Sequence, residues 1–364
     1  MKVSEIVHCI ESEFPKALQE SYDNCGLIAG NPNEEVKGIL LALDVTEAVL
    51  KEASKKGLNF IISHHPAVFQ NIKHFTGANS TERILIYALQ NKIALFSAHT
   101  NLDNHQNGLN EYLANSLGLK HSIVLSPMEG RLQKLVMFVP VSEADKVREA
   151  IFTAGSGHIG EYDMCSFNIE GAGTFRALDK ANPYVGAKGQ LHREPELRIE
   201  TIMPEFIQEK VIRALLEAHP YEEVAYDIYP LANNWKQNGS GRIGTLENSV
   251  EESKFLDGVK AALKSKCLRH SVLTGKMIRK VAVCGGSGSF LIHRAIMAGA
   301  DAFVSADFKY HQFFEGEGKI LLIDAGHFET EQFALQLFYD VLNKKIPNFA
   351  VHFSESAINP VNYY

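Results

Sequence analysis

The sequence predicts an α/β protein: a split α/β core with mainly parallel sheets and a ferredoxin-like α+β domain inserted between its halves. Near both ends of the chain, short apolar segments alternate with amphipathic segments of helical period. This alternation is typical of parallel strands covered by helices on both faces. The middle of the chain instead follows the order β-α-β-β-α-β. We therefore expect a first core half over residues 1–130, an insert over 131–232 and a second core half over 233–364.

The first core half begins with an amphipathic helix over residues 1–14, because Ile6, Val7, Ile10 and Phe14 fall on one helical face. Three strand–helix pairs follow, with strands over 38–44, 58–63 and 93–98 and helices over 46–56, 80–91 and 108–117. Ligands of such sheets bind beyond the carboxyl ends of the strands. Side chains that directly follow these strands are therefore the first candidates for a site.

The second core half repeats this rhythm, whereas the insert differs from it. In the second half we expect strands over 279–284, 302–306, 320–324 and 351–353, a helix that ends at Met297 and a long helix over 329–342. In the insert we expect strands over 134–140, 196–202 and 224–229, helices over 143–154 and 204–219, and a glycine-rich stretch that runs to Phe175. The polar segment 233–241 is expected to be the exit linker.

Composition excludes several classes of protein. The chain has 364 residues, of which 45% are hydrophobic and 22% charged, as in globular proteins. No apolar run approaches the roughly 20 residues of a membrane span, and Glu5, Glu11 and Glu13 argue against a secretory signal; we expect a cytoplasmic protein with no membrane partner. The net charge of -7 without a basic block argues against a nucleic-acid partner. Five scattered cysteines without a CxxC pair indicate reduced thiols.

Two adjacent histidines are the most informative feature of the chain. His64 and His65 follow the apolar run 58–62 and precede Pro66. Successive side chains of a strand point to opposite faces. Both imidazoles can therefore converge on one point only if the strand has already ended, and Pro66 is consistent with that. Neutral imidazole is the commonest protein ligand for transition metals, so this pair predicts a metal site.

Three further residues complete the candidate ligand set. Asp103 follows the next strand, and His327 and Glu331 stand four residues apart at the start of the last long helix, a spacing that puts both on one helical face. The set suits one metal ion, or two ions bridged by Glu331 at the separation of about 3.5–4 Å found in hydrolytic metal pairs. Zinc, manganese, iron and cobalt all accept such mixed nitrogen and oxygen ligands.

Weaker candidates surround this set. His99 and His311 follow strand ends and are candidates for a general acid or base, although polar residues are also common at such positions. Asp44 could support a ligand or cap the next helix. The glycine-rich segment 285–288 could bind an anion at a helix N-terminus, but a tight turn is the simpler explanation.

Four motifs occur in order along the chain: SHHP at 63–66, TNLD at 100–103, DFKYH at 307–311 and DAGHFETE at 324–331. Together they resemble the GTP cyclohydrolase 1 type 2 homolog family, also called YbgI/YqfO-like dinuclear metal proteins. Three segments of the insert, at 157–160, 171–175 and 219–223, resemble the long branch of that family. Its insert is similar to the ferredoxin-like domains of PII and CutA proteins.

The resemblance implies two divalent metal ions per chain, zinc first among the four metals, held by His64, His65, Asp103, His327 and Glu331. It also implies a homohexameric ring. On this basis we expect a metal-dependent, cyclohydrolase-like hydrolase of a nucleotide-type small molecule. In this hypothesis His64 pairs with His327, His65 pairs with Asp103, and Glu331 bridges the ions. The alternative is a regulatory or scaffold ring that binds metal, senses a ligand through its insert and has no catalytic turnover.

Overall fold

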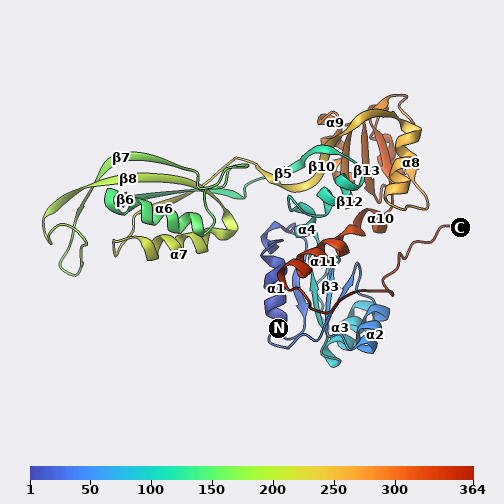
Figure 1. Cartoon of the computed structure of the whole chain (residues 1–364), viewed down its shortest axis with the longest axis horizontal. Coiled ribbons are helices and arrows are strands. Elements are labelled where there is room, and N and C mark those ends of the chain that lie inside the picture. Colours follow the sequence, from blue (N-terminus) through green and yellow to red (C-terminus); the bar gives the residue numbers. More distant parts are fainter. The chain divides into compact units, whose positions relative to one another are not determined.

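The computed structural model describes all 364 residues of the chain. The chain forms two compact units, which Figure 1 shows coloured along the sequence. One, here called the two-part unit, combines residues 1–127 with residues 237–364. The other, the 128–236 unit, is continuous in sequence. None of the helices combines the length and the apolar character that a membrane crossing requires.

The first sheet of the two-part unit has five strands in the order β1-β4-β3-β2-β15. These strands are β1 (Gly26–Ala29), β2 (Ile39–Ala42), β3 (Phe60–Ser63), β4 (Ala94–Ser97) and β15 (Val351–Phe353). Neighbouring strands from β4 to β15 run parallel, whereas β1 is antiparallel to β4. The parallel strands place the carboxyl ends of β2, β3 and β4 at one edge.

Helices cover both faces of this sheet because its strands are apolar on both sides. The helices of the two-part unit are α1 (Val3–Glu11), α2 (Glu47–Lys56), α3 (Ser80–Gln90), α4 (Thr100–Asn104), α5 (Leu109–Ser116), α8 (Glu252–Ala262), α9 (Ile292–Met297), α10 (His327–Glu331) and α11 (Phe333–Lys345), with short 3-10 helices η1 (Lys16–Leu18), η4 (Ser289–Leu291) and η5 (Tyr310–Phe314). Ile39 and Leu41 of β2 pack with α1 and α11 on one face. Leu40 packs with α2 and α3 on the other face.

The second sheet of this unit has six strands in the order β11-β14-β13-β12-β10-β5. These strands are β5 (Lys120–Met128), β10 (Trp235–Glu251), β11 (Arg269–His270), β12 (Met277–Ser287), β13 (Ala302–Ala306) and β14 (Leu321–Asp324). The three strands β12, β13 and β14 are parallel, and the antiparallel strands β10 and β11 flank them. Both sheets are therefore mixed. An antiparallel edge strand needs no crossover helix, so the strand–helix alternation did not indicate it.

Two expected elements differ in the structure. The segment 233–241, expected to be a linker, lies largely in β10, where Asn238 is buried and accepts a hydrogen bond from the backbone N–H of Gln106 at 3.0 Å. The expected long helix over 329–342 consists of two helices, α10 and α11, which meet at Gln332. In both places a polar side chain has specific partners in the fold, since Gln332 donates to the carbonyl oxygens of Leu263 and Glu329, both at 2.9 Å.

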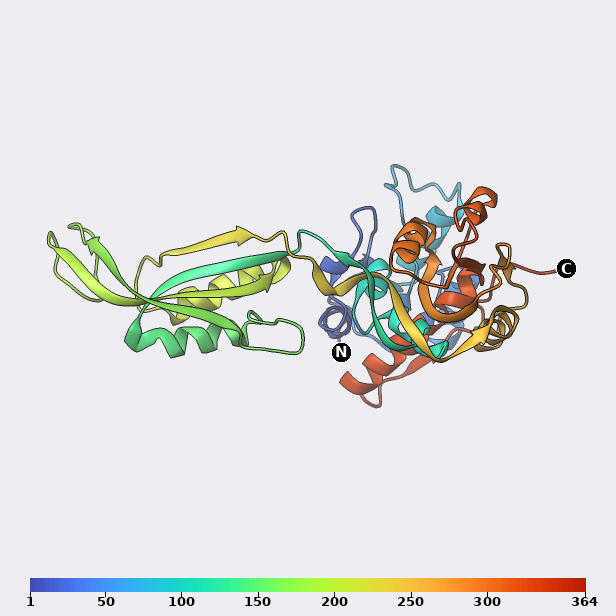
Figure 2. The same ribbon diagram turned by 90° about the horizontal axis from the view of Figure 1, so that it is seen from above.

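The 128–236 unit contains one antiparallel sheet of four strands in the order β7-β8-β6-β9. Its elements are β6 (Leu132–Pro140), η2 (Val141–Glu143), α6 (Ala144–Thr153), β7 (Ser166–Arg176), β8 (Leu191–Pro204), η3 (Glu205–Ile207), α7 (Gln208–Ala218) and β9 (Tyr226–Pro230). Both α6 and α7 lie on the same face of the sheet (Figure 2). The opposite face carries no helix.

Candidate metal centre

The two adjacent histidines lie just beyond the end of β3. The strand ends at Ser63, and the backbone N–H groups of His64 and His65 still donate to the carbonyl oxygens of Ala42 and Leu43, at 3.3 and 2.9 Å. The backbone of both residues is thus held beside β2. Because the strand has already ended, the two rings need not point to opposite faces of the sheet. Their ring planes make an angle of 46°, with centroids 5.1 Å apart. The rings therefore approach the same region from different directions.

The other candidate ligands come from two helices, one after β4 of the first sheet and one after β14 of the second sheet. Asp103 lies on α4, and His327 and Glu331 lie one turn apart on α10. The helix α10 packs against the glycine-rich end of β12, where a Cβ at Gly286 would overlap the carboxylate of Glu331. Gly286 also has a φ of 59°, which favours glycine. The glycines of segment 285–288 thus let the backbone approach Glu331 closely. Most of the segment belongs to β12, which ends at Ser287, so it is not a turn that caps a helix.

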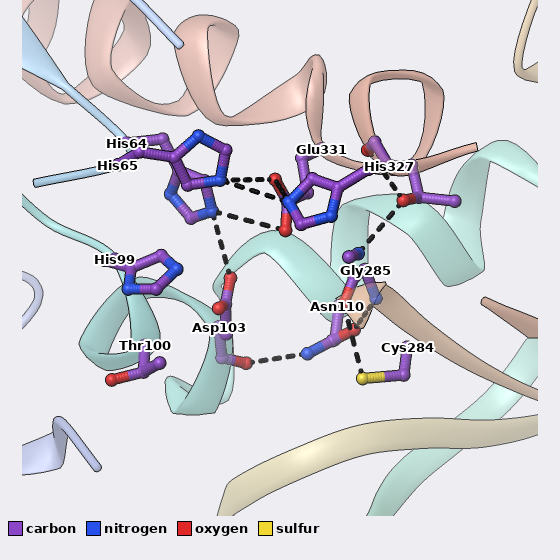
Figure 3. A network of polar contacts seen from close by, with 12 residues as sticks. His64, His65, His99, Thr100, Asp103, Asn110, Cys284, Gly285, His327 and Glu331 are labelled. Atoms are coloured by element: carbon purple, nitrogen blue, oxygen red, sulfur yellow. Dashed lines mark hydrogen bonds and ion pairs between the residues drawn. The ribbon is translucent and has the colours of Figure 1, made fainter. Parts of the chain in front are cut away.

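The ligand atoms converge in two groups (Figure 3). The Nε2 atoms of His65 and His327 lie 3.2 Å apart, and each is 2.9 Å from Oε2 of Glu331. The Nε2 atom of His64 lies 3.6 Å from Oδ1 of Asp103 and 3.8 Å from Oε1 of Glu331. This grouping differs from the expected one, because the directions of the two adjacent rings depend on rotamers that the sequence does not reveal. Glu331 stands between the groups, as expected for a bridging carboxylate.

Hydrogen bonds from the other ring nitrogen orient these three imidazoles. The Nδ1–H groups donate from His64 to the carbonyl oxygen of Ala98 (3.0 Å), from His65 to Oδ1 of Asp44 (2.8 Å) and from His327 to Oδ2 of Asp307 (2.6 Å). A carbonyl or carboxylate oxygen only accepts, so the proton of each neutral ring is on Nδ1 and the Nε2 lone pair faces the cluster. Histidine ligands of metals are held in this way.

Buried atoms without partners test whether a metal fits. Nε2 of His64 and Oδ1 of Asp103 are buried and make no hydrogen bond. Oε2 of Glu331 is also buried, and its polar contacts are the Nε2 atoms of His65 and His327. No lysine or arginine lines the cavity beside them. Leaving such groups unpaired is costly, and two neighbouring buried carboxylates repel each other. A divalent cation would satisfy all three atoms, so the donor set fits a metal.

The protonation of the cluster leads to the same conclusion. Burial favours the neutral form of His65, but hydrogen bonds to Asp44 and Glu331 outweigh it and raise its pKa to about 9. The pKa of His327 is raised to about 10, because its bonds to Asp307 and Glu331 likewise outweigh burial. Burial lowers the pKa of His64 to about 4. Without a cation, the raised pKa values of His65 and His327 favour protons on the two Nε2 atoms nearest Glu331, and a bound metal would replace these protons.

The pKa values of the two carboxyl groups in the cluster are shifted in opposite directions. Burial opposes the ionisation of Glu331, but its bonds to the histidines hold its pKa well below the usual range. Burial, together with the charge of Glu331, raises the pKa of Asp103 well above the usual range. Asp103 is therefore the ligand that lacks a positive partner, and a cation near it would favour its ionised form.

Comparison with known proteins places the chain among its relatives. A family model described as Duf34/NIF3 (NGG1p interacting factor 3) matches residues 1–360. The chain belongs to this family.

Relatives named GTP cyclohydrolase 1 type 2 homolog agree with the Duf34/NIF3 assignment. The Bacillus subtilis (strain 168) protein is 37% identical over 99% of this chain and 98% of its own length. The protein from Halalkalibacterium halodurans is 41% identical over 84% of this chain and 82% of its own. A solved structure described as a Bacillus cereus protein related to NIF3 is 38% identical, with a TM-score of 0.87 over 100% of this chain and 99% of that one. The resemblance noted in the motifs is therefore confirmed.

The structure places the two general acid–base candidates of this Duf34/NIF3 protein differently. The ring centroid of His99 lies 5.1 Å from that of His64 and 5.4 Å from that of His65. By contrast, His311 lies exposed on η5, contacts the rings of Tyr310 and Phe314, and does not line the cavity of the cluster. Asp307 turns the chain through a φ of 57° after β13, and η5 then carries His311 away.

Sequence reasoning missed Asp23, which holds His99 in place. Its buried carboxylate accepts from Nδ1 of His99 and from the backbone N–H of Thr100, each at 3.0 Å, and from the Thr100 hydroxyl. Burial opposes the ionisation of Asp23, but these bonds lower its pKa below the usual range. Asp23 belongs to a loop before β1, where no periodic pattern marks it. Its role becomes visible only in the structure, through its contacts with His99 and Thr100.

A cavity of about 560 Å³ opens beside the cluster. His65, His99, Asp103, His327 and Glu331 are among the residues that line it. Tyr22, Phe69 and Phe290 also line it, and these three side chains are 70%, 53% and 64% exposed. The cavity therefore joins a polar floor to exposed aromatic rings, and its volume lies within the range of small-molecule sites.

Proposed function

We propose that this protein is a dinuclear metal-dependent hydrolase of a nucleotide-type small molecule. The observation that carries the proposal is the convergence of buried polar atoms of His64, Asp103 and Glu331 with the oriented Nε2 atoms of His65 and His327. We infer that His65 and His327 hold one ion and that His64 and Asp103 hold the other. Glu331 would supply one oxygen to each. The mixed nitrogen and oxygen donors favour zinc, with manganese, iron or cobalt as alternatives.

Bound metal ions would lower the pKa of a water molecule and polarise a substrate oxygen. The chain's own residues would orient the metal-binding imidazoles and transfer a proton during the reaction. Asp44 and Asp307 hold the rings of His65 and His327, and Asp23 holds His99 with Nδ1 protonated. His99 then presents Nε2 to the cavity as the group that takes up or releases a proton. His99 can also offer a ligand atom together with His64 and His65. The metal content of a His99→Ala variant would therefore show whether His99 also binds an ion.

The aromatic rim supports a flat substrate. Phe69 meets the His99 ring edge-to-face, with centroids 5.6 Å apart, and the rings of Tyr22 and Phe290 are also exposed. Exposed ring faces beside a polar floor suit a heterocycle whose polar groups reach the metal centre. The name of the relatives, GTP cyclohydrolase 1 type 2 homolog, points to ring-opening hydrolysis of a purine nucleotide as the first reaction to test.

The test combines metal analysis with a substrate panel. Glu331→Gln and Glu329→Gln change neighbouring buried carboxylates on α10, but the Glu329 carboxylate accepts a hydrogen bond from Asn359 instead of facing the cluster. We expect close to two divalent ions per chain in the wild type and in Glu329→Gln, fewer in Glu331→Gln, and metal-dependent hydrolysis of at least one nucleotide. Turnover that survives complete metal removal would refute the proposal.

We further propose a cytoplasmic homohexameric ring and a ferredoxin-like, PII/CutA-type domain over 131–232. The strand order β7-β8-β6-β9, with one helix after β6 and one after β8, supports the domain type. Exposed apolar side chains of the two-part unit, including Met297, Tyr310 and Phe314, support association with further copies. Light scattering of the full chain measures the oligomeric state, and limited proteolysis measures the domain boundaries.

A further inference from the structure

The helix-free face of the sheet in the 128–236 unit carries a second cavity, of about 1000 Å³. Along β8, the side chains of Leu197 and Ile199 pack toward α6 and α7. The alternate side chains of Glu196 and Arg198 therefore lie on the opposite face, where they line this cavity. The loop between β7 and β8 contributes Tyr184 to its wall. The cavity is thus built within one unit and is separate from the metal centre.

A buried carboxylate without a cationic partner lies in this cavity. Glu196 is only 8% exposed. Its Oε1 accepts a hydrogen bond from the Tyr221 hydroxyl at 3.0 Å, and no lysine, arginine or histidine forms an ion pair with it. The nearest basic residues along β8 pair with other carboxylates: Arg198 pairs with Glu200 through Nη2, while its Nε has no hydrogen-bond partner, and His192 pairs with Glu194.

Glycine makes room for this carboxylate. A Cβ at Gly173 would overlap the carboxyl group of Glu196 from the neighbouring strand. The absence of a side chain at Gly173 therefore leaves room for the Glu196 carboxylate. A buried carboxylate without a counter-charge is costly unless a ligand brings the opposite charge.

Aromatic rings line the cavity around Tyr221, the residue that donates to this carboxylate. The ring of Tyr221 lies 6.0 Å from that of Phe175 and 6.2 Å from that of Tyr184, measured between centroids. The faces of such rings attract organic cations, most strongly where water is excluded. A carboxylate within a group of aromatic rings is the chemistry that recognises an ammonium group attached to an apolar chain.

The lining of the cavity has no excess of basic side chains that would favour an anionic ligand. Four carboxylates line the cavity, from Glu170, Glu196, Glu222 and Glu223, against three basic side chains, from Arg176, Lys180 and Arg198. A phosphate in the cavity would meet the buried charge of Glu196. A nucleotide is therefore disfavoured here, although aromatic rings alone would accept its base.

We propose that this cavity binds an organic ammonium compound, a diamine or polyamine, with Glu196 pairing with its charged nitrogen and with Phe175, Tyr184 and Tyr221 packing around it. The Tyr221 hydroxyl fixes Glu196 by donating to it, which leaves Oε2 for the ligand. This binding is independent of the hydrolytic function proposed above.

Calorimetric titration of the full chain with putrescine tests the proposal, with butanediol of the same chain length as the neutral control ligand. We expect saturable binding of putrescine and none of butanediol. Glu196→Gln should weaken putrescine binding at least about tenfold, since it removes the charge and keeps the shape. Glu149→Gln is the matched control, because Glu149 is exposed on α6, away from the cavity, and it should bind as the wild type does.

A second variant covers the case in which Glu196→Gln fails to fold. Tyr184 is 53% exposed on the loop, so Tyr184→Leu should fold and weaken putrescine binding about threefold to tenfold through loss of the ring face. Equal binding of butanediol, unchanged binding in both cavity variants, or a Kd for putrescine weaker than about 10 mM would overturn the proposal. So would tight binding of GTP that putrescine fails to displace and that Glu196→Gln strengthens.

Discussion

Removing the carboxylates that orient the ligand histidines should weaken metal binding by a calculable amount. Asp44 accepts from Nδ1 of His65 at 2.8 Å, and Asp307 accepts from Nδ1 of His327 at 2.6 Å. Loss of such a partner typically costs about 10-fold to 100-fold in metal affinity, which corresponds to roughly 1.4–2.7 kcal/mol. The Asp44 and Asp307 side chains are 46% and 51% exposed. Because water can then replace part of each interaction, we expect about tenfold for each alanine variant.

Asparagine separates the two contributions of these carboxylates. In Asp44→Asn and Asp307→Asn the amide oxygen still accepts the Nδ1–H bond, so the ring keeps its orientation and loses only the nearby charge. We expect a loss of about threefold, between the wild type and alanine. The double alanine variant should lose more affinity than either single variant, and the departure of its loss from about a hundredfold measures the coupling of two rings that share Glu331.

The assay is competition between metal-depleted protein and a chromophoric chelator at fixed pH and ionic strength. Asp340→Ala is the matched control, since Asp340 bonds to Tyr112 and Gln336 and has no contact with the cluster. Zinc affinity within twofold of the wild type for both Asp44→Ala and Asp307→Ala would refute the reasoning, because the orienting bonds would then not matter for the site.

Three further outcomes follow from the structure. Asp23→Ala should lower the free energy of unfolding by about 2–4 kcal/mol, because it leaves the buried donors of His99 and Thr100 unpaired; urea denaturation measures this, and a loss below about 1 kcal/mol would contradict it. Burial opposes the ionisation of Glu52, but bonds from Lys56, Ser354 and the backbone N–H groups of residues 355 and 356 outweigh it and lower the pKa to about 2. Glu52 therefore stabilises the fold above the usual carboxyl pKa of 4.5, and this stabilisation should fade as the pH falls from 4.5 toward 2; the protection factors for amide exchange at 355 and 356 should fall over that interval in the wild type and be low throughout in Glu52→Gln. Chelation should lower the melting temperature of metal-loaded protein, since free metal at 1,000 times Kd stabilises by about 4 kcal/mol, and it should lower that of Glu331→Gln less in differential scanning fluorimetry.

Local patterns in the sequence predicted the central strands because their residues repeat with clear periods. Strand β13 covers the expected residues, and β3 ends at Ser63, directly before the histidines. The edge strands β1, β5 and β11 were not expected. Their exposure or shortness leaves little apolar signal, and their pairing depends on partners far away in sequence.

The site was predictable in composition and not in arrangement. His64, His65, Asp103, His327 and Glu331 could be named because they follow strand ends or share a helix face. Which imidazole turns toward α10 depends on side-chain rotamers that no spacing encodes. Asp23 could not be inferred for a different reason, because its contact with His99 joins positions 76 residues apart through an unpatterned loop.

The order of the proposed metal ligands along the chain has a consequence for biosynthesis. His64, His65 and Asp103 leave the ribosome long before His327 and Glu331, and the whole 128–236 unit is made in between. At translation rates of about 5–20 residues per second, the interval is on the order of ten to fifty seconds. During that time the nascent chain displays two histidines and an aspartate without the glutamate that joins them. A metal ion captured then would have an incomplete set of ligands, so productive loading belongs to the stage after α10 has docked beside β12.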